Sequence, residues 1–274
     1  MISGPTASLL KQLVLRDLRL RYRSTMFGFL WSFVRPVTMI VIFYMVFAVF
    51  LDFRAGVFGM PEAVNYGLFL AIGILSWTFF SSAVSEGTST YLVHQQLISR
   101  ACFWRPALPF SNSLSHWIHY LLTQFILIVV LGVAGCHSWG FSLFLLVPIS
   151  IAELALVTSV VWILSALNVF ARDTAQFADL GLMVLFYASP IIYPAHHAIL
   201  ALEKYHAGFL YLANPLAPCV MLRQKILLWE SAGGGAWPLV PAWSIGFSII
   251  VTIVLAFTAV QLNQRMNRVI ADKL

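Results

Sequence analysis

Residues 106–152 read PALPFSNSLSHWIHYLLTQFILIVVLGVAGCHSWGFSLFLLVPISIA, and they contain no aspartate, glutamate, lysine or arginine. A membrane-spanning helix needs about 20 apolar residues, so this stretch is too long for one span and long enough for two. Glycines and polar groups gather from Gly135 to Gly140, where they favour a turn. The stretch therefore predicts one span at about 107–134 and another at about 141–167, with Glu153 inside the second.

The composition of the whole chain agrees with this interpretation. Of 274 residues, 61% are hydrophobic and 9% are charged, whereas a soluble domain carries about 25% charged residues. An aromatic content of 15% excludes a disordered chain. The net charge of +6 is too thinly spread to indicate a nucleic-acid binder. We therefore expect an integral membrane protein, and the length allows roughly five to seven spans.

Four further apolar windows complete the predicted topology, at 27–51, 66–84, 174–193 and 239–262. The predicted fold class is all-α integral membrane, with six transmembrane helices in a single domain over residues 1–274. An N-terminal interface helix occupies 1–26 and spans one to five occupy 27–193. An outer loop follows at 194–238, then span six at 239–262 and a cytoplasmic tail at 263–274.

The basic residues predict the orientation, because cytoplasmic loops carry an excess of lysine and arginine. Arg35 is left out of this comparison, since it lies inside the first span. With six spans, eleven basic residues fall on the side of the two termini and four on the other, so both termini are predicted to be cytoplasmic. The eleven are Lys11, Arg16, Arg19, Arg21, Arg23, Arg100, Arg105, Arg172, Arg265, Arg268 and Lys273, and the four are Arg54, Lys204, Arg223 and Lys225.

Two cytoplasmic segments each leave two interpretations open. Residues 9–23 have the pattern of a basic amphipathic helix at the membrane surface, which either attaches to anionic lipid or contacts a protein. The loop 85–106 contains apolar residues from Tyr91 to Ile98, more than a solvated connection needs. It is either a docking element for a cytoplasmic partner or an interfacial connector.

The outer loop contains a third unusual segment. Residues 207–222 are apolar for sixteen residues, too short to span, and are interrupted by Asn214-Pro215 and Ala217-Pro218. This pattern predicts re-entrant or interfacial helices. Because irregular backbone at membrane depth lies within protein or along a wet cavity, the segment is expected to border a pathway.

Several short sequence motifs also occur along the chain in a characteristic order. Residues 15–23 read LRDLRLRYR and precede Gly28-Phe29-Leu30-Trp31 and Pro36, and Ser189-Pro190-Ile191-Ile192-Tyr193-Pro194 ends the fifth span. Together with three other pieces they resemble the ABC-2 type polysaccharide exporter permeases, which export O-antigen, teichoic acid and some capsular polysaccharides. The other pieces are Leu97-Ile98 with Phe103 and Leu108-Pro109, then Phe170-Ala171-Arg172-Asp173, then Asn214-Pro215 with Arg223.

The resemblance implies a homodimer of six-span subunits with two copies of a separate cytoplasmic ABC ATPase. The dimer would enclose the channel. The resemblance further implies that the N-terminal helix and the 85–106 loop contact the ATPase, through Arg16, Arg19, Arg23, Leu97, Arg100, Phe103 and Arg105. Elements after the fifth span would form an outer gate, for which the expected residues are Pro190, Pro194, Asn214, Pro215 and Arg223.

The chemistry of a sugar passage predicts the channel lining. Glycans offer hydroxyl groups and apolar C–H faces, so aromatic side chains can hold them loosely, although most aromatic residues of a membrane protein serve packing or the interfacial belt. Arg35 either snorkels to the headgroups or binds the phosphates of a lipid carrier bidentately. The expected lining residues are Phe27, Trp31, Arg35, Tyr44, Trp77, Phe80, Phe186, Tyr187 and Tyr193.

The sequence therefore predicts the channel-forming permease subunit of an exporter that moves a lipid-linked polysaccharide across a bacterial inner membrane. O-antigen is favoured because Tyr22-Arg23 and 28–31 look nearer that branch, and teichoic acid or capsule export is the alternative. An ion-coupled carrier is a rival that would need paired charges within the membrane. We expect neither an enzyme nor a cofactor site in this chain, since no Walker GxxxxGK[ST] motif occurs and the histidine pairs His116/His119 and His196/His197 lack the other ligands of a metal site. ATP and Mg²⁺ would bind the partner.

Overall fold

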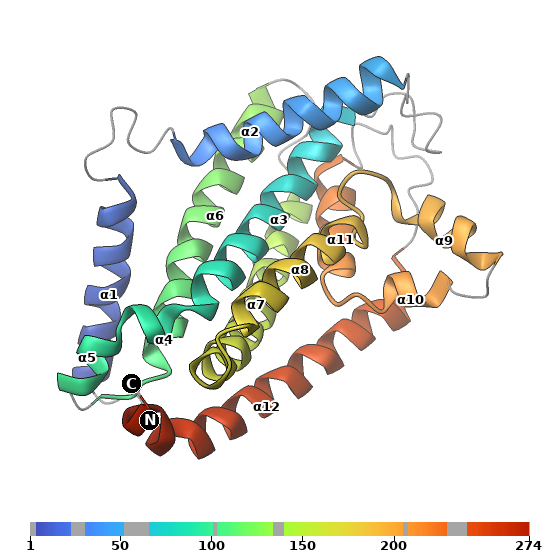
Figure 1. Cartoon of the computed structure of the whole chain (residues 1–274). Coiled ribbons are helices and arrows are strands. Elements are labelled where there is room, and N and C mark those ends of the chain that lie inside the picture. Colours follow the sequence, from blue (N-terminus) through green and yellow to red (C-terminus); the bar gives the residue numbers. More distant parts are fainter. Residues whose placement is uncertain are drawn as a thin grey trace.

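The structure is a computed structural model that describes residues 4–22, 31–51, 66–100, 103–133, 140–204, 208–228 and 240–273. Phe27 and Arg23 lie outside these ranges, as do the side chains of Trp31 and Arg100. Within the described ranges every regular element is a helix. The all-α fold class predicted from the sequence is confirmed (Figure 1).

Five helical segments are long and apolar enough to cross a membrane. They are α2 (Trp31–Tyr44) with its π-helical continuation η2 (Met45–Phe50), α3 (Tyr66–Thr88), α6 (Ala107–Val133), η4 (Phe141–Leu145) with α7 (Leu146–Phe170), and α12 (Ala242–Lys273). Three helices pass their predicted ends. Helix α3 continues beyond residue 84, α7 continues beyond residue 167 to Phe170, and α12 continues through the segment predicted to be a tail.

The predicted fifth span is shorter than expected. Helix α8 covers Thr174–Tyr187, and its 14 residues rise about 21 Å, less than the roughly 30 Å of hydrocarbon. It ends just before Ser189-Pro190, because a residue that precedes proline is displaced from the helical conformation. The count of six spans therefore stays a prediction.

Helix α3 is the centre of the bundle. About two thirds of its apolar window is buried, against 6% for the first candidate span and 11% for α12. It packs on α2, α6, α7, α8 and α11, and the stacked rings of Phe79 and Tyr120 join it to α6 at 4.9 Å. Gly87 allows a close approach of α7, since a Cβ atom there would lie 2.5 Å from Cγ1 of Val161.

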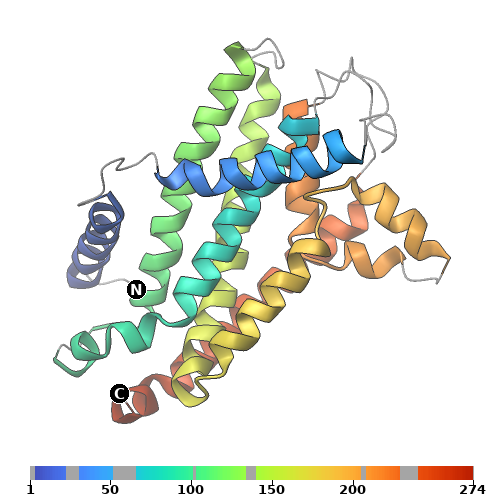
Figure 2. The same cartoon turned by 45° about the horizontal axis from the view of Figure 1, so that its top comes forward.

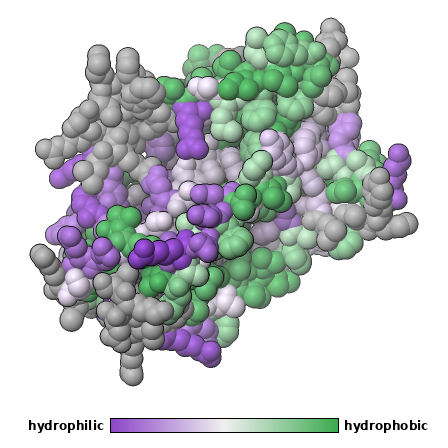
Figure 3. Space-filling model, in the orientation of Figure 1, coloured by the Kyte–Doolittle hydropathy of each residue, from purple (hydrophilic) through white to green (hydrophobic). Residues whose placement is uncertain are grey.

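Short helices gather at one end of the molecule. The start of α1 (Gly4–Tyr22), α4 (Thr90–Val93), α5 (Gln95–Arg100), the 171–173 turn and the last turns of α12 all lie at the lower left of Figure 1. In the same view, hydrophilic side chains spread over this end and hydrophobic ones cover the opposite upper part, over α2 (Figure 3). This grouping is the one expected if both termini and the 85–106 loop share one side of the membrane.

A buried cluster joins these short helices to the bundle, and it consists of Leu13, Tyr91, Ile98, Leu108 and Ala166. The hydroxyl of Tyr91 donates to Oδ1 of Asn263 on α12 at 2.8 Å. Burial raises the pKa of Tyr91 above its ordinary value, so the phenol keeps the proton that it donates. Helix α4 is therefore attached to α12.

The described residues of the 194–238 segment form three helices, α9 (Ala195–Glu203), α10 (Gly208–Leu212) and α11 (Ala217–Leu228). Helices α9 and α10 pack mainly on each other, whereas α11 packs against α3 and α7. Ser248 at the start of α12 donates to the carbonyl of Pro215 at 2.6 Å, just before α11. A re-entrant course for these helices stays a prediction.

Candidate functional site

A cleft of about 450 Å³ is lined by residues of α2, α3 and α8. Helix α2 crosses α3 beside α8 (Figures 1 and 2). The volume of the cleft falls within the range of about 300–1,000 Å³ typical of ligand sites. Residues spaced four apart share one face of a helix, so each helix presents a row of side chains to it. The rows are Arg35, Met39 and Phe43 on α2, Trp77, Ser81 and Ser85 on α3, and Asp179, Met183 and Phe186–Tyr187 on α8.

One end of the cleft is aromatic. The ring of Phe186 lies 5.3 Å from Trp77 and 5.6 Å from Phe43, so a residue from each of the three helices meets there. Tyr187 lies edge-on to Phe186 at 5.2 Å. These flat apolar surfaces are suited to the C–H faces of a sugar.

The other end of the cleft is polar. Helices α2 and α8 run in roughly the same direction along the cleft, and α3 runs in the opposite direction. The lining residues nearest the start of α2 and α8 therefore lie beside those nearest the end of α3. These residues include Arg35, Asp179 and Ser85. The hydroxyl of Ser85 donates to Asp179 at 3.0 Å. Glu86 contacts His116 at 2.9 Å, on the side of α3 where Arg35 also borders a smaller cavity of about 180 Å³. The cleft therefore combines one guanidinium with hydroxyl groups and carboxylates.

Four of the predicted channel residues line this cleft: Arg35, Trp77, Phe186 and Tyr187. Phe80 lies behind Trp77 in the buried core. Tyr44 is exposed outside the cleft, and Tyr193 packs on Tyr211 while its hydroxyl donates to the carbonyl of Tyr187. Their channel role stays a prediction, as does that of Phe27 and Trp31.

Sequence reasoning missed the polar half of the lining. Asp179 and the hydroxyl row of α3, which includes Thr78, Ser81, Ser82 and Ser85, were not selected. Their four-residue spacing was visible in the sequence. Hydroxyl groups are common in spans, however, and only the packing of α8 on α3 shows which row faces the cleft.

The residues predicted to dock an ATPase lie at the polar end of the molecule. Arg19 is exposed, and Arg16 contacts both Asp17 at 3.1 Å and His94, which lies between α4 and α5, at 2.6 Å. Leu97 and Phe103 are half-buried against the cluster around Tyr91 and Ile98, so their apolar surface has a structural use. Arg105 is half-buried nearby, and among the described residues of the 85–106 loop Val93 and Trp104 have exposed large apolar side chains.

Four of the five residues predicted to form an outer gate, all but Arg223, lie around the turn after α8. Pro190 and Pro194 are buried, and the Asn214 amide donates to the carbonyl of Ala188 at 3.2 Å and to Oγ of Ser189 at 2.8 Å. Pro215 follows Asn214 in the turn before α11. None of these contacts tests the gate role, which stays a prediction.

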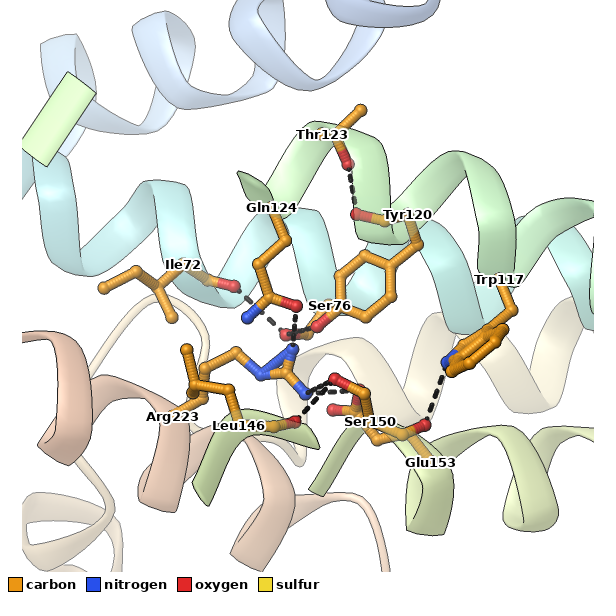
Figure 4. A network of polar contacts seen from close by, with 10 residues as sticks. All are labelled: Ile72, Ser76, Trp117, Tyr120, Thr123, Gln124, Leu146, Ser150, Glu153 and Arg223. Atoms are coloured by element: carbon orange, nitrogen blue, oxygen red, sulfur yellow. Dashed lines mark hydrogen bonds and ion pairs between the residues drawn. The ribbon is translucent and has the colours of Figure 1, made fainter. Parts of the chain in front are cut away.

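Arg223 was predicted to lie in the outer loop, but the structure places it on α11 in the protein interior. Its guanidinium contacts the Glu153 carboxylate of α7 at 2.7 Å, and both side chains are at most 2% exposed (Figure 4). The count of outer basic residues therefore falls to three, against eleven on the side of the termini, and the predicted orientation is unchanged. A carboxylate within a span is a functional candidate by default, but the partner of Glu153 lies 70 residues away in the chain, and no local sequence pattern reveals it.

Five helices that are long and apolar enough to cross a membrane define this chain as a multi-pass membrane protein. Residues 8–228 match the family model of the ABC-2 type transporters. The chain belongs to the ABC-2 type transporter family.

Curated relatives carry a common description. Two proteins of Klebsiella pneumoniae, each described as the O-antigen export system permease protein RfbA, are 31% and 29% identical. Their alignments cover 75% and 78% of this chain and 74% and 77% of the relatives. A protein of Myxococcus xanthus with the same description is 29% identical over 80% of this chain and 79% of its own length.

Proposed function

We propose that this chain is the channel-forming permease subunit of an ABC exporter that moves a lipid-linked polysaccharide of the O-antigen type from the cytoplasm to the periplasm. The observation that carries the proposal is the cleft between α2, α3 and α8, with aromatic rings at one end and Arg35 with hydroxyl groups at the other. Membership of the ABC-2 family and the description shared by three relatives support it.

The cleft offers each part of such a substrate a matching group. Rings of Trp77, Phe186 and Tyr187 present flat faces to sugar C–H groups, and the α3 hydroxyl groups exchange hydrogen bonds with sugar hydroxyls. Arg35 has the planar fork that pairs with phosphate oxygens bidentately. Weak contacts spread along the cleft hold a chain without stopping its passage.

The partners follow from the proposal. A second copy of the chain completes the channel, and two copies of a cytoplasmic ABC ATPase bind at the end that carries α4 and α5. ATP and Mg²⁺ belong to that partner, and this chain carries no cofactor of its own. The complex lies in the bacterial inner membrane with both termini of each copy in the cytoplasm.

The decisive experiment is deletion of the gene followed by chemical identification of the glycan that accumulates on its lipid carrier in the cytoplasm. An O-antigen chain should accumulate and return to the cell surface when the gene is restored. Accumulation of a teichoic acid or capsule precursor would instead assign the chain to another branch of polysaccharide export, and normal surface glycans would contradict the proposal.

An ion-coupled carrier is the second candidate, because it would use paired charges within the membrane and the Glu153–Arg223 pair has that character. The two candidates differ in their need for ATP. Export should stop when the Walker lysine of the partner ATPase is replaced. Transport by this chain alone in vesicles with an ion gradient would establish the carrier.

A further inference from the structure

The Glu153–Arg223 pair is the centre of a polar cluster that joins four helices (Figure 4). Nη1 of Arg223 donates to Oε1 of Gln124 on α6 at 2.9 Å, and its guanidinium lies 5.0 Å from the ring of Tyr120. The hydroxyl of Tyr120 in turn contacts Ser76 of α3 at 3.1 Å. One side chain of α11 is thereby bound to α6 and α7, and through Tyr120 to α3.

A buried pair of this kind fixes a helix firmly. A guanidinium and a carboxylate inside a protein attract each other strongly, and the loss of either partner leaves the other charge buried without compensation. Val220, Leu227 and Leu228 of α11 are fully buried in the same core as α3 and α7. Helix α11 is therefore a fixed part of the bundle, whereas α9 and α10 pack in a second cluster, to which α11 contributes Met221.

The residue next to Arg223 carries this attachment to α8. Nε2 of Gln224 donates to the carbonyl of Pro190 at 2.9 Å, and Gln224 is buried. Pro190 belongs to the turn that ends α8, two residues after Ala188. Arg223 and Gln224 are adjacent in α11. Arg223 contacts α6 and α7, and Gln224 contacts the turn that ends α8.

The turn itself is enclosed on several sides. Ile191 is fully buried, and a Cβ atom on Gly73 of α3 would lie only 3.0 Å from its Cα atom. The hydroxyl of Tyr66 donates to the carbonyl of Ile192 at 2.8 Å. The turn directly follows Phe186 and Tyr187, which line the cleft, so its position determines where these two rings stand.

We propose that Arg223 is a positioning residue for the cleft: its buried contacts with Glu153 and Gln124 fix α11, and α11, through Gln224, holds the turn that places Phe186 and Tyr187. The proposal concerns the conformation of this chain, and only its consequence for transport rests on the proposed function. Under this proposal Arg223 belongs to the part of the protein that keeps its position during transport, and it is not part of a gate that opens.

The test measures how often the turn opens. In a background with Cys102, Cys136 and Cys219 replaced by alanine, Ile191→Cys places a single thiol at the fully buried position of the turn. Its rate of modification by a soluble maleimide in the purified full-length protein reports local opening. The variants to compare are Arg223→Met, Glu153→Leu, the double variant, Gln224→Leu and the matched control Lys225→Met, which removes a positive charge from the same helix.

We expect either single charge variant to raise the labelling rate at least on the order of tenfold, since each leaves a buried charge. The double variant should return to within about threefold of the parent, because two apolar residues can replace a buried pair. Gln224→Leu should raise the labelling rate while the melting temperature stays near that of Lys225→Met, which a general loss of stability would not do.

Three results would overturn the proposal: Arg223→Met labelling at the parent rate, the double variant labelling as fast as the single variants, or Gln224→Leu leaving the turn protected. Glycan export is measured separately in cells. Export that falls in step with labelling extends the proposal to transport. Absence of glycan export from the parent itself would contradict the proposed function and leave the thiol result standing.

Discussion

Arg35 lies at the polar end of the cleft, and it is the one basic side chain among the described lining residues. Lysine keeps its charge but loses the planar fork that binds phosphate bidentately. If Arg35 binds the phosphates of the lipid carrier, Arg35→Lys should export glycan at a reduced rate and Arg35→Gln should nearly abolish export. Surface glycan in a complemented deletion strain is the measurement.

The control for this pair of variants is Lys204→Gln, which removes an exposed charge from the end of α9, away from the cleft. All three proteins should reach the membrane and bind the ATPase equally. Arg35 contributes only a snorkelling charge if Arg35→Gln exports normally, and phosphate binding is then excluded.

Gly87 provides a test of the packing between α3 and α7. A methyl group there would lie 2.5 Å from Cγ1 of Val161 and 3.0 Å from Oδ1 of Asn112, and valine is stiff about χ1. Gly87→Ala should therefore lower the free energy of unfolding by about 1–3 kcal/mol. Thermal unfolding in detergent is the measurement.

The matched variant is Gly246→Ala on α12, where a Cβ atom meets no atom of the other described residues within 4 Å beyond its chain neighbours and its own helix backbone. Alanine is the better helix former, so this change should leave the melting temperature equal or slightly raised. Equal melting temperatures for the two variants would show that α7 approaches Gly87 less closely than described.

At the scale of the elements, the sequence predicts helices well where charge is absent and poorly where a helix leaves the membrane. Helices α3, α6 and α7 were predicted where charge is scarce, with Glu153 the one charged residue of the predicted 141–167 window, and the structure has a long apolar helix at each place. Helix α12 passes residue 262 because Asn263 hydrogen-bonds Tyr91 and the polar residues continue on helical backbone. Hydropathy marks the membrane boundary and carries no information on where the helix ends.

The site was predicted only in part for a similar reason. Aromatic residues such as Trp77 and Phe186 are recognisable as candidates, since large amphiphilic rings are conspicuous in a span. The pairing of Glu153 with Arg223 depends on how α7 and α11 pack, and so does the exposure of the hydroxyl row at Ser81 and Ser85. Such contacts join distant segments and have no local signature.

Helices α4 and α5 permit a test of ATPase docking. Val93 is 72% exposed, whereas Ile98 is 5% exposed inside the cluster that attaches these helices. If α4 and α5 dock the ATPase, Val93→Glu and Arg100→Glu should reduce co-purification of the partner and ATP-dependent export without changing the melting temperature. Ile98→Glu should instead destabilise the protein, because it buries an unpaired charge.

A normal yield of the ATPase complex and full export by Val93→Glu together with Arg100→Glu would show that α4 and α5 are a connector only.

At the scale of the whole molecule, the predicted orientation is open to direct measurement. Lys204 and Arg265 are both exposed. Lys204 directly follows α9 and Arg265 belongs to the last third of α12, and α9 and the C-terminal end of α12 lie far apart in Figure 1. In intact cells, a membrane-impermeant maleimide should label Lys204→Cys and leave Arg265→Cys unmodified. Permeabilised cells, in which both should react, are the control, and the reverse pattern would invert the topology.

Helix α12 has a further consequence, which concerns rotation. It contacts the Pro215 turn through Ser248 and α4 through Asn263, two positions separated by about 22 Å of continuous helix. Each residue of an α-helix turns the following chain by about 100°, so the angular offset between these contacts is set by the number of residues between them. One alanine inserted between them would aim one contact away from its partner without shortening or unfolding the helix. The number of residues between Ser248 and Asn263 therefore determines whether both contacts can form at the same time. An insertion or deletion in this part of α12 should impair the protein more than most substitutions along the lipid-facing surface of the helix.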